Sequence, residues 1–390
     1  MPDVTLIGNT LNTMGGGERV TAHMLLTLEA LGHDVTLMTW DSPDWDRIDR
    51  LFHDEIRLSN HVESAEPLGP DYVPLDRVGW SDALRWLERS RRIYRKTDLV
   101  VNSQGNTVPA YAHVSYVHFP TFALLHPALE EIAKHHLSAY VSSRKDEMMM
   151  RVRQPVYKSL MEHSAVVLAN SHFTKSCLDK VVDAETSVLY PPVEAEDIIG
   201  VAESAGDRGN TVVTISHIRR DKRLEMIPEI AKKVEEAEFR VIGHIHDSDY
   251  HGELLRATED IGVEDRVSFE TGLDRVGLLR SIVEAKVYLH TMPYEHFGIS
   301  PVEAMAAGLV PVVHRSGGPY RDMLDGKQGE YGYWYEGVQD AAERITGLLG
   351  DERLRESLSE KCVERSKMFD TGVFRERFSS YIDLALDGSR

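Results

Sequence analysis

Two glutamates, Glu295 and Glu303, lie eight positions apart on either side of a short segment that contains a glycine, in EHFGISPVE. The apolar VYLH before them predicts a buried strand, and the SPVE that follows predicts a helix that Ser300 caps and that ends at Gly308. Each carboxylate offers two acceptor oxygens, which suits the vicinal hydroxyls of a sugar. The pattern therefore favours a sugar-nucleotide site.

The start of the predicted helix supplies a second kind of ligand group. Backbone N–H groups around Phe297, Gly298 and Ile299 would be free to bind an anion, and a diphosphate is a good candidate. Glu303 has an alternative interpretation, as a capping-box carboxylate that folds back on Ser300. Glu295 lies at the carboxyl end of the predicted strand, where open parallel sheets bind their ligands.

Positive charge follows another predicted strand, at 212–215. The cations directly after it are Arg219, Arg220, Lys222 and Arg223. Breaking the bond between a sugar and a nucleotide diphosphate creates positive charge on the ring and negative charge on the phosphate, so an enzyme has to stabilise both. Up to four cations would therefore lie at the carboxyl end of this strand, and we interpret Arg220 and Arg223 as the solvated start of a helix.

The segment from Glu295 resembles the E-x7-E motif of retaining glycosyltransferase family 4, with that family's EAMAAG helix and PVV strand after it. Further matches follow in the family's order: Asn170-Ser171, LYPPVE ending at Glu194, SHIRRDK from Ser216 to Lys222, and Ser316-Gly317-Gly318. The segments GGGERV from Gly15 and YVHFP from Tyr116 are similar to the branch that includes the dolichol-linked-oligosaccharide α1,2-mannosyltransferases. The resemblance spans nearly the whole chain.

The resemblance implies a role for each matching residue of the later half. Arg219 and Lys222 would bind the diphosphate, although the commoner family spacing places the arginine where His217 stands. Glu303 would bind the nucleotide ribose, and Glu295 would bind hydroxyls of the donor sugar beneath the forming oxocarbenium ion. The donor-binding set is completed by Phe297, Gly298, Ile299 and Ser300.

Two segments of the earlier half complete the candidate site. By resemblance, His118 would face the donor sugar from the first domain, and this role depends on the flanking YVHFP, because a lone histidine is usually structural. The three glycines at 15–17, Gly15, Gly16 and Gly17, do not form a G-x-G-x-x-G fingerprint, so they do not favour a dinucleotide site. They would let the backbone approach a sugar or phosphate closely, and a flexible loop without a ligand is the alternative.

The function that the resemblance implies is a retaining transfer of a hexose from a nucleotide diphosphate sugar to a glycan hydroxyl, either free or lipid-linked. GDP-mannose is suggested by the branch, while UDP-glucose and UDP-N-acetylglucosamine stay open. We expect no metal and no other cofactor, and we interpret Asp247-Ser248-Asp249 as a turn. The alternatives are a nucleotide-sugar epimerase on the same scaffold and a non-catalytic glycan- or nucleotide-binding relative.

The order of elements predicts an α/β chain with two halves. A chain of 390 residues exceeds one usual core, and strand–helix–strand patterns occur from Val4 and again from Val212. The resemblance implies the GT-B fold, in which two doubly wound Rossmann-like domains face each other across a cleft. We expect an acceptor-binding domain at 1–192, a polar connection, and a nucleotide-sugar-binding domain at 208–370. The apolar stripe of a last helix within 371–390 would pack back on the first domain.

Composition limits location and partners. Forty-four basic against 63 acidic residues give a net charge of −19, which opposes nucleic-acid binding. Two cysteines cannot form a disulfide framework, and the N-terminus lacks the pattern of a signal peptide, so we expect a cytoplasmic protein. The segment 134–158 is basic and contains three methionines, which would suit peripheral contact with an anionic membrane, although a solvated helix is the commoner explanation.

Overall fold

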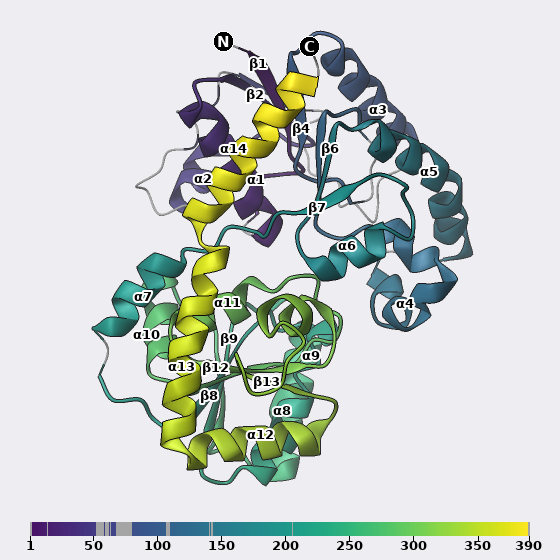
Figure 1. Cartoon of the computed structure of the whole chain (residues 1–390). Coiled ribbons are helices and arrows are strands. Elements are labelled where there is room, and N and C mark those ends of the chain that lie inside the picture. The colour runs from purple at the N-terminus through teal and green to yellow at the C-terminus, as the bar shows by residue number, and fades with distance from the viewer. Residues whose placement is uncertain are drawn as a thin grey trace. The chain divides into compact units, whose positions relative to one another are not determined.

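The computed structural model describes the chain except for residues 1, 14, 52–57, 59–61, 63, 68–79, 107–109, 140, 142, 205 and 389–390. The chain divides into two compact units (Figure 1). Unit 1 comprises residues 1–192 and 371–390, and unit 2 comprises residues 193–370.

Unit 1 is built around a parallel sheet whose described strands run in the order β3-β2-β1-β4-β5-β6-β7. Its strands form because runs such as VTLI and LVVN are mostly apolar and buried along their length, which suits a sheet covered on both faces. The strands are β1 (Asp3–Ile7), β2 (Asp34–Thr39), β3 (Ser64–Pro67), β4 (Leu99–Asn102), β5 (Val114–Val117), β6 (Val166–Ala169) and β7 (Thr186–Val188). The strands expected near 4, 35, 99, 114 and 166 are confirmed.

The helices of unit 1 connect these parallel strands. They are α1 (Gly16–Ala30), α2 (Trp45–Leu51), α3 (Trp80–Tyr94), α4 (Glu130–His136), α5 (Arg144–His163) and α6 (His172–Leu178), with short 3-10 turns η3 (Thr121–Leu125), η4 (Pro127–Leu129) and η5 (Leu137–Ala139). The sheet order reverses direction between β1 and β4. In an open parallel sheet, the carboxyl ends of the two strands at such a switch point form the usual ligand site.

The last helix, α14 (Thr371–Gly388), belongs to unit 1 although it follows unit 2 in the chain. Phe374, Phe378 and Ile382 are buried in the same core cluster as Val4 and Leu28. Figure 1 shows α14, in yellow, lying along α1. The apolar stripe at the end of the chain is therefore core, as its helical spacing indicated.

Unit 2 contains a parallel sheet with strand order β10-β9-β8-β11-β12-β13. Its order reverses between β8 and β11, so these two strands form its switch point. The strands are β8 (Thr211–Ile215), β9 (Glu238–Ile242), β10 (Val267–Glu270), β11 (Val287–His290), β12 (Val310–His314) and β13 (Tyr333–Tyr335). They confirm the strands expected near 212, 239, 267, 287 and 310.

The helices of unit 2 are α7 (Ala195–Glu203), α8 (Met226–Lys233), α9 (Ser248–Ile261), α10 (Arg275–Val283), α11 (Ile299–Ala306), α12 (Val338–Gly350) and α13 (Glu352–Ser366). Three short turns add η6 (Arg220–Lys222), η7 (Pro319–Met323) and η8 (Lys367–Phe369). None of the helices in the described ranges of the chain is long and apolar enough to cross a membrane.

The polar connection expected between the domains is largely helix α7, so that expectation is wrong. Ala195 and Ile198 are fully buried and belong to a core cluster of unit 2 that also contains Ala304. The polar residues of this segment form the outer face of α7. Its two buried side chains are enough to anchor a nine-residue helix, so a polar composition did not prevent helix formation.

The chain enters unit 2 at Val193 and leaves it after Asp370. These two ends of unit 2 are bonded to each other. Val193 forms a parallel bridge with Asp370, and its backbone N–H donates to the Phe369 carbonyl at 3.1 Å. The Asp370 carboxylate also accepts from the backbone N–H of Glu196 at 3.2 Å. The start of α7 and the end of η8 are thus held together.

Candidate active site

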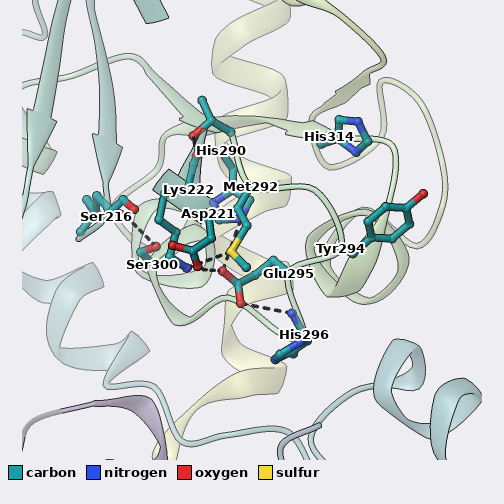
Figure 2. A network of polar contacts seen from close by, with 12 residues as sticks. Ser216, Asp221, Lys222, His290, Met292, Tyr294, Glu295, His296, Ser300 and His314 are labelled. Atoms are coloured by element: carbon teal, nitrogen blue, oxygen red, sulfur yellow. Dashed lines mark hydrogen bonds and ion pairs between the residues drawn. The ribbon is translucent and has the colours of Figure 1, made fainter. Parts of the chain in front are cut away.

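The switch point of unit 2 brings together the ends of β8 and β11. The segment after β8 leads to η6 and Lys222, and the segment after β11 carries Glu295 and leads into α11 (Figure 2). Lys222, predicted to bind phosphate, and Glu295, predicted to bind sugar, therefore lie next to each other, although they are 73 positions apart in sequence.

Helix α11 begins two residues earlier than the sequence indicated. Its cap is Gly298, with φ of +91°, and Ser300 lies inside the first turn, so the prediction of Ser300 as the cap is wrong. The Ser300 hydroxyl instead donates to the Ile215 carbonyl at 3.1 Å and contacts the Tyr288 hydroxyl at 2.9 Å. Because Ser300 is not the cap, the capping-box alternative for Glu303 is wrong as well.

The positive φ of Gly298 explains this difference. A β-carbon at Gly298 would lie 3.1 Å from the Pro301 side chain and 3.2 Å from that of Pro319, in a conformation that other residues rarely adopt. Only the folded chain shows that this glycine, rather than the serine two residues later, turns the backbone into the helix.

Glu295 is held by two hydrogen bonds on opposite oxygens. Its Oε2 accepts from Lys222 Nζ at 2.8 Å, and its Oε1 accepts from the backbone N–H of His296 at 3.1 Å. Burial opposes ionisation, but the charge of Lys222 and its hydrogen bond outweigh it, so the pKa of Glu295 is well below its ordinary value. Both side chains are mostly buried, with 17% of Lys222 and 16% of Glu295 exposed.

His290 ends β11 beside this ion pair and was not among the residues predicted from sequence. Its Nε2 lies 3.9 Å from Glu295 Oε2, and its Nδ1 lies 3.3 Å from the Tyr288 hydroxyl. Burial and the positive charge of Lys222 outweigh the attraction of Glu295 and lower the pKa of His290 to about 4, so the ring is neutral at pH 7. The sequence carried no signal beyond a polar residue at the end of an apolar strand.

Glu303 is bound to an arginine that sequence reasoning missed. Arg275, the first residue of α10, donates to Glu303 Oε1 at 2.7 Å and to Glu194 Oε2 at 3.3 Å. The Glu303 side chain is 6% exposed and that of Arg275 is 15% exposed, so the pair is largely shielded from solvent. A buried carboxylate needs such a partner to remain charged, and Arg275 supplies it.

The cations after β8 have separate partners. Arg219 forms a bidentate contact with the Asp221 carboxylate, in which Arg219 Nη2 donates to Asp221 Oδ2 at 2.6 Å. The Arg219 side chain is 52% exposed. Arg220 donates to both oxygens of Glu253 at 2.7 Å and lies 5.1 Å from the Tyr250 ring. Arg220 therefore ties this segment to α9, whereas Lys222 points toward Glu295, in keeping with the interpretation that separated Arg220 from the phosphate ligands.

His217 stands where the commoner family spacing places an arginine. Its ring lies 4.3 Å from that of His246, and burial together with the neighbouring positive groups lowers its pKa to about 4. A neutral imidazole cannot supply the charge of a guanidinium at pH 7. This supports the choice of Arg219 over His217 as the partner of Lys222.

The Asp247-Ser248-Asp249 segment is the start of a helix, so its prediction as a turn is wrong. Asp247 caps α9 by accepting from the backbone N–H of Tyr250 at 2.9 Å, and its other oxygen lies 3.4 Å from Arg220. Within the described ranges of the chain, no group of three or more His, Cys, Asp or Glu side chains is arranged to hold a metal ion.

In unit 1 the candidate glycines follow β1, a strand of the switch point, and His118 follows β5, the neighbour of β4. The glycine-rich segment after β1 leads into α1, with Gly15 as the cap, and its N–H donates to Glu18 Oε2 at 2.9 Å. A β-carbon added to Gly17 would lie 2.9 Å from Gln104 Nε2 and 3.6 Å from His118 Nε2. The structure therefore brings Gly17 and His118 together, and adds Gln104, which the sequence did not indicate.

His118 is fixed by backbone and amide groups. Its Nε2 lies 3.0 Å from the Ser103 carbonyl and must donate to it, because a carbonyl only accepts. Its backbone N–H donates to Asn106 Oδ1 at 2.7 Å. Burial outweighs the hydrogen bond to Ser103 and lowers the pKa of His118 to about 4, so this ring is also neutral at pH 7.

Two family models match the chain over adjoining ranges. Glycosyltransferase Family 4 matches residues 14–197, and Glycosyl transferases group 1 matches residues 195–365. Together they cover the two units apart from the ends of the chain, and they agree with the resemblance that the motifs indicated.

Curated relatives share one name. The GDP-Man:Man(3)GlcNAc(2)-PP-Dol alpha-1,2-mannosyltransferase of Dictyostelium discoideum is 24% identical over 312 residues, which cover 73% of this chain and 60% of the relative. The human protein of that name is 28% identical over 287 residues, which cover 65% of this chain and 58% of the relative. The chain thus spans roughly three fifths of the length of these relatives.

Solved structures match over the full length. Sucrose-phosphate synthase from Thermosynechococcus elongatus superposes with a TM-score of 0.74 at 17% identity, and both chains are covered completely. Anabaena HepE in complex with UDP-glucose has a TM-score of 0.69 at 16% identity, with 98% of this chain and 100% of that chain covered. At these identities the likeness concerns the fold, and it confirms the expected GT-B architecture.

Proposed function

The chain belongs to the glycosyltransferases that combine a family 4 domain with a group 1 domain, and from this premise we propose that it transfers a hexose with retention. The donor would be a nucleotide diphosphate sugar and the acceptor a hydroxyl of a glycan. The observation that supports this most is the Lys222–Glu295 pair, 2.8 Å apart at the switch point of unit 2. Lys222 would serve as the cation for the phosphate, and Glu295 beside it as the carboxylate for the sugar.

The first chemical task is to stabilise the leaving diphosphate. Lys222 and Arg219 would neutralise its charge, and the backbone N–H groups of residues 297–299 would bind its oxygens at the start of α11. Arg219 would have to exchange its contact with Asp221 for the phosphate, which its exposed position allows. Glu303, held by Arg275, would accept hydrogen bonds from the ribose.

The second task is to stabilise the sugar as its anomeric carbon becomes positive. Glu295 of unit 2 would bind sugar hydroxyls, and we propose that His118 is a sugar-binding residue of unit 1. In a retaining transfer the acceptor hydroxyl attacks from the face that the diphosphate leaves. The leaving diphosphate can then take the proton of the hydroxyl, so the mechanism needs no separate strong base.

We assign GDP-mannose as the donor. The support comes from the relatives named GDP-Man-dependent mannosyltransferases, and the main rival is UDP-glucose, the ligand of the HepE structure. A thermal-shift screen with GDP, UDP and ADP would test this, because a ligand at 100 times its Kd adds about 2.7 kcal/mol of stability. Stabilisation by GDP alone supports the assignment, stabilisation by UDP redirects it, and no response to any of the three contradicts nucleotide-sugar transfer.

Transfer itself requires a product assay. Incubation with GDP-mannose and a polyisoprenyl-diphosphate oligosaccharide should give a mannosylated product with an α linkage, read by NMR at the anomeric carbon. A parallel incubation with donor alone separates the epimerase alternative, which would give an isomerised sugar. The matched control is Lys222→Ala, which should form no product above background.

We propose a lipid-linked acceptor, approached through helix α5. Met148, Val152 and Val156 recur every four residues and are exposed, and Arg144 and Lys145 are exposed beside them. The charge argument is weaker than the sequence indicated. Arg151 pairs with Glu147, Lys158 pairs with Asp183, and Met150 is buried. The apolar stripe is therefore the stronger support.

Liposome co-sedimentation tests the membrane contact. The wild type should bind vesicles of phosphatidylglycerol better than vesicles of phosphatidylcholine, because the stripe is flanked by Arg144 and Lys145. The double variant Met148→Ser, Val152→Ser should lose most of this binding, whereas Leu384→Ser, at another exposed apolar side chain, should not. Equal binding by all three proteins would reject this contact.

A further inference from the structure

Three polar side chains, Ser300, Tyr288 and His290, link the first turn of α11 to the Lys222–Glu295 pair. Ser300 contacts the Ile215 carbonyl and the Tyr288 hydroxyl, the Tyr288 hydroxyl contacts His290, and His290 faces Glu295. Both Tyr288 and His290 are buried. Such a chain determines where each proton lies.

The proton positions follow from the carbonyl at one end. The single hydroxyl hydrogen of Ser300 goes to the Ile215 carbonyl, which can only accept. Ser300 Oγ must therefore accept from the Tyr288 hydroxyl at 2.9 Å. The Tyr288 oxygen has then used its own hydrogen, so it accepts from His290 Nδ1 at 3.3 Å. Neutral His290 thus carries its proton on Nδ1 and a lone pair on Nε2.

That lone pair faces a group that cannot satisfy it. Nε2 of His290 is buried without a hydrogen-bond partner in the described part of the chain, and Glu295 Oε2, at 3.9 Å, is itself an acceptor. Two buried acceptors that face each other gain a hydrogen bond only when a proton is added between them. In this structure Lys222 supplies the charge that Glu295 needs, so the proton is not required.

Binding of a donor changes this balance. Lys222 now donates to Glu295 and lies 3.0 Å from Met292 Sδ, and under the proposed function it turns toward the diphosphate. A mostly buried carboxylate that loses its cation is costly, and another basic group within 4 Å is His290. We propose that His290 takes up a proton from solvent at Nε2 when the donor draws Lys222 away, and that it then holds Glu295 in position. This inference rests on the proposed function.

The electrostatics of the surrounding groups agree with this exchange. His290 is surrounded by Glu295, Lys222 and His314, and by Tyr288 on its own strand. Burial first, then Lys222 and His314, lower its pKa to about 4, whereas Glu295 raises it. Removing Lys222 from this set takes away one lowering influence and leaves the raising one. The pKa of His290 must therefore rise on donor binding, so binding takes up a proton and strengthens as the pH falls.

Calorimetry measures this uptake directly. Nucleotide-sugar binding is followed in buffers of different ionisation enthalpy at about pH 6, where a histidine can respond to its surroundings. GDP-mannose is the first probe and UDP-glucose the second, because a diphosphate diester does not titrate in this range. The wild type should take up a proton, and its affinity should rise as the pH is lowered, by at most about tenfold per unit.

Two substitutions separate this role from a structural one. His290→Gln places an uncharged donor near Glu295, so binding should persist while proton uptake and the pH dependence of affinity are lost. Tyr288→Phe removes the hydroxyl that holds the proton on Nδ1, so the neutral ring can carry it on Nε2 and uptake should fall. His251→Asn is the matched control, because His251 also has a buried, unpartnered Nε2 but packs on Phe269.

The outcomes are distinct. Uptake in the wild type and in His251→Asn, with none in His290→Gln, supports the inference. Equal uptake in wild type and His290→Gln, or no uptake by a wild type that binds donor tightly, overturns it and leaves the proposed function intact. Failure of both nucleotide sugars to bind the wild type contradicts the proposed function and the inference together.

Discussion

The candidate residues of the two units differ in charge. In unit 2 the two carboxylates are each paired with a cation, Glu295 with Lys222 at 2.8 Å and Glu303 with Arg275 at 2.7 Å. In unit 1 the candidate histidine, His118, is neutral and held by a backbone carbonyl at 3.0 Å. The same sheet topology thus carries a charged site in one unit and an uncharged one in the other.

The difference indicates what each unit is prepared to bind. Paired charges can change partners when a ligand binds, so Lys222 of unit 2 could turn to a diphosphate, and protonated His290 would then replace it as the partner of Glu295 under the inference above. A neutral imidazole beside a close glycine backbone instead suits hydroxyl groups, which need donors and acceptors but no counter-charge. The comparison predicts that substitutions in unit 2 act mainly on donor binding and on the chemical step.

The largest effect is expected from Lys222→Ala. It removes the charge for the leaving phosphate and the partner of Glu295, so kcat/KM should fall by 100-fold or more, in line with about 3 kcal/mol for a lost transition-state contact. Steady-state kinetics with the donor identified by the screen would measure it. Lys232→Ala, at an exposed lysine of α8, is the control. Similar kinetics for the two variants would contradict a role for Lys222 in phosphate stabilisation.

A smaller effect is expected from Arg275→Ala. Glu303 would lose the buried cation that holds it for its proposed contact with the ribose, so nucleotide diphosphate affinity should fall by roughly tenfold to 100-fold, and stability should fall too, as for a broken buried pair. Titration calorimetry with GDP or UDP would measure the affinity. Arg275→Lys keeps the charge but not the fork that reaches both Glu303 and Glu194, so it should restore part of the loss. Wild-type affinity in Arg275→Ala would show that Glu303 does not depend on this arginine.

The neutral state of His118 predicts a pH effect in unit 1. Its pKa is about 4 in the folded protein and 6.5 when the chain is unfolded, so between these values only the unfolded state binds the proton. This contribution to stability is fully present above pH 6.5 and is lost as the pH falls toward 4. From about pH 6.5 to 5, the wild type should lose about 1.5 kcal/mol more of its free energy of unfolding than His118→Asn. Urea unfolding at the two pH values would measure it, and parallel losses would mean that His118 titrates in the folded protein as it does in the unfolded chain.

The smallest effects come from the two glycines that begin α11 and α1. Gly298→Ala should cost about 1–2 kcal/mol, because its φ of +91° is strained for any other residue. Gly17→Ala has ordinary helical geometry, and its β-carbon meets the flexible end of Gln104 at 2.9 Å, so its stability should change by less than about 1 kcal/mol. Thermal unfolding distinguishes them. An equal cost at both positions would mean that crowding rather than backbone strain determines the effect.

Much of the fold could be read from the sequence because parallel strands that are buried on both faces are continuous apolar runs. Those runs placed most strands near their observed positions, and the stripe of Phe374, Phe378 and Ile382 placed α14 in a core. The errors came where local rules compete. Gly298, rather than Ser300, caps α11 because of its positive φ. Helix α7 forms in a polar segment because two buried side chains, Ala195 and Ile198, are enough to anchor it.

The chemical types at the candidate site were determined by sequence alone: two carboxylates after a strand, cations after another, glycines before a helix, and a histidine at a strand end. Only the tertiary structure decided their partners. Arg275 reaches Glu303 across 28 positions and Glu194 across 81, and His290 meets Glu295 by way of the loop between β11 and α11. Local composition specifies which side chains can bind charge, but the pairing of buried charges depends on which strand ends become neighbours, and that is a property of the folded sheet.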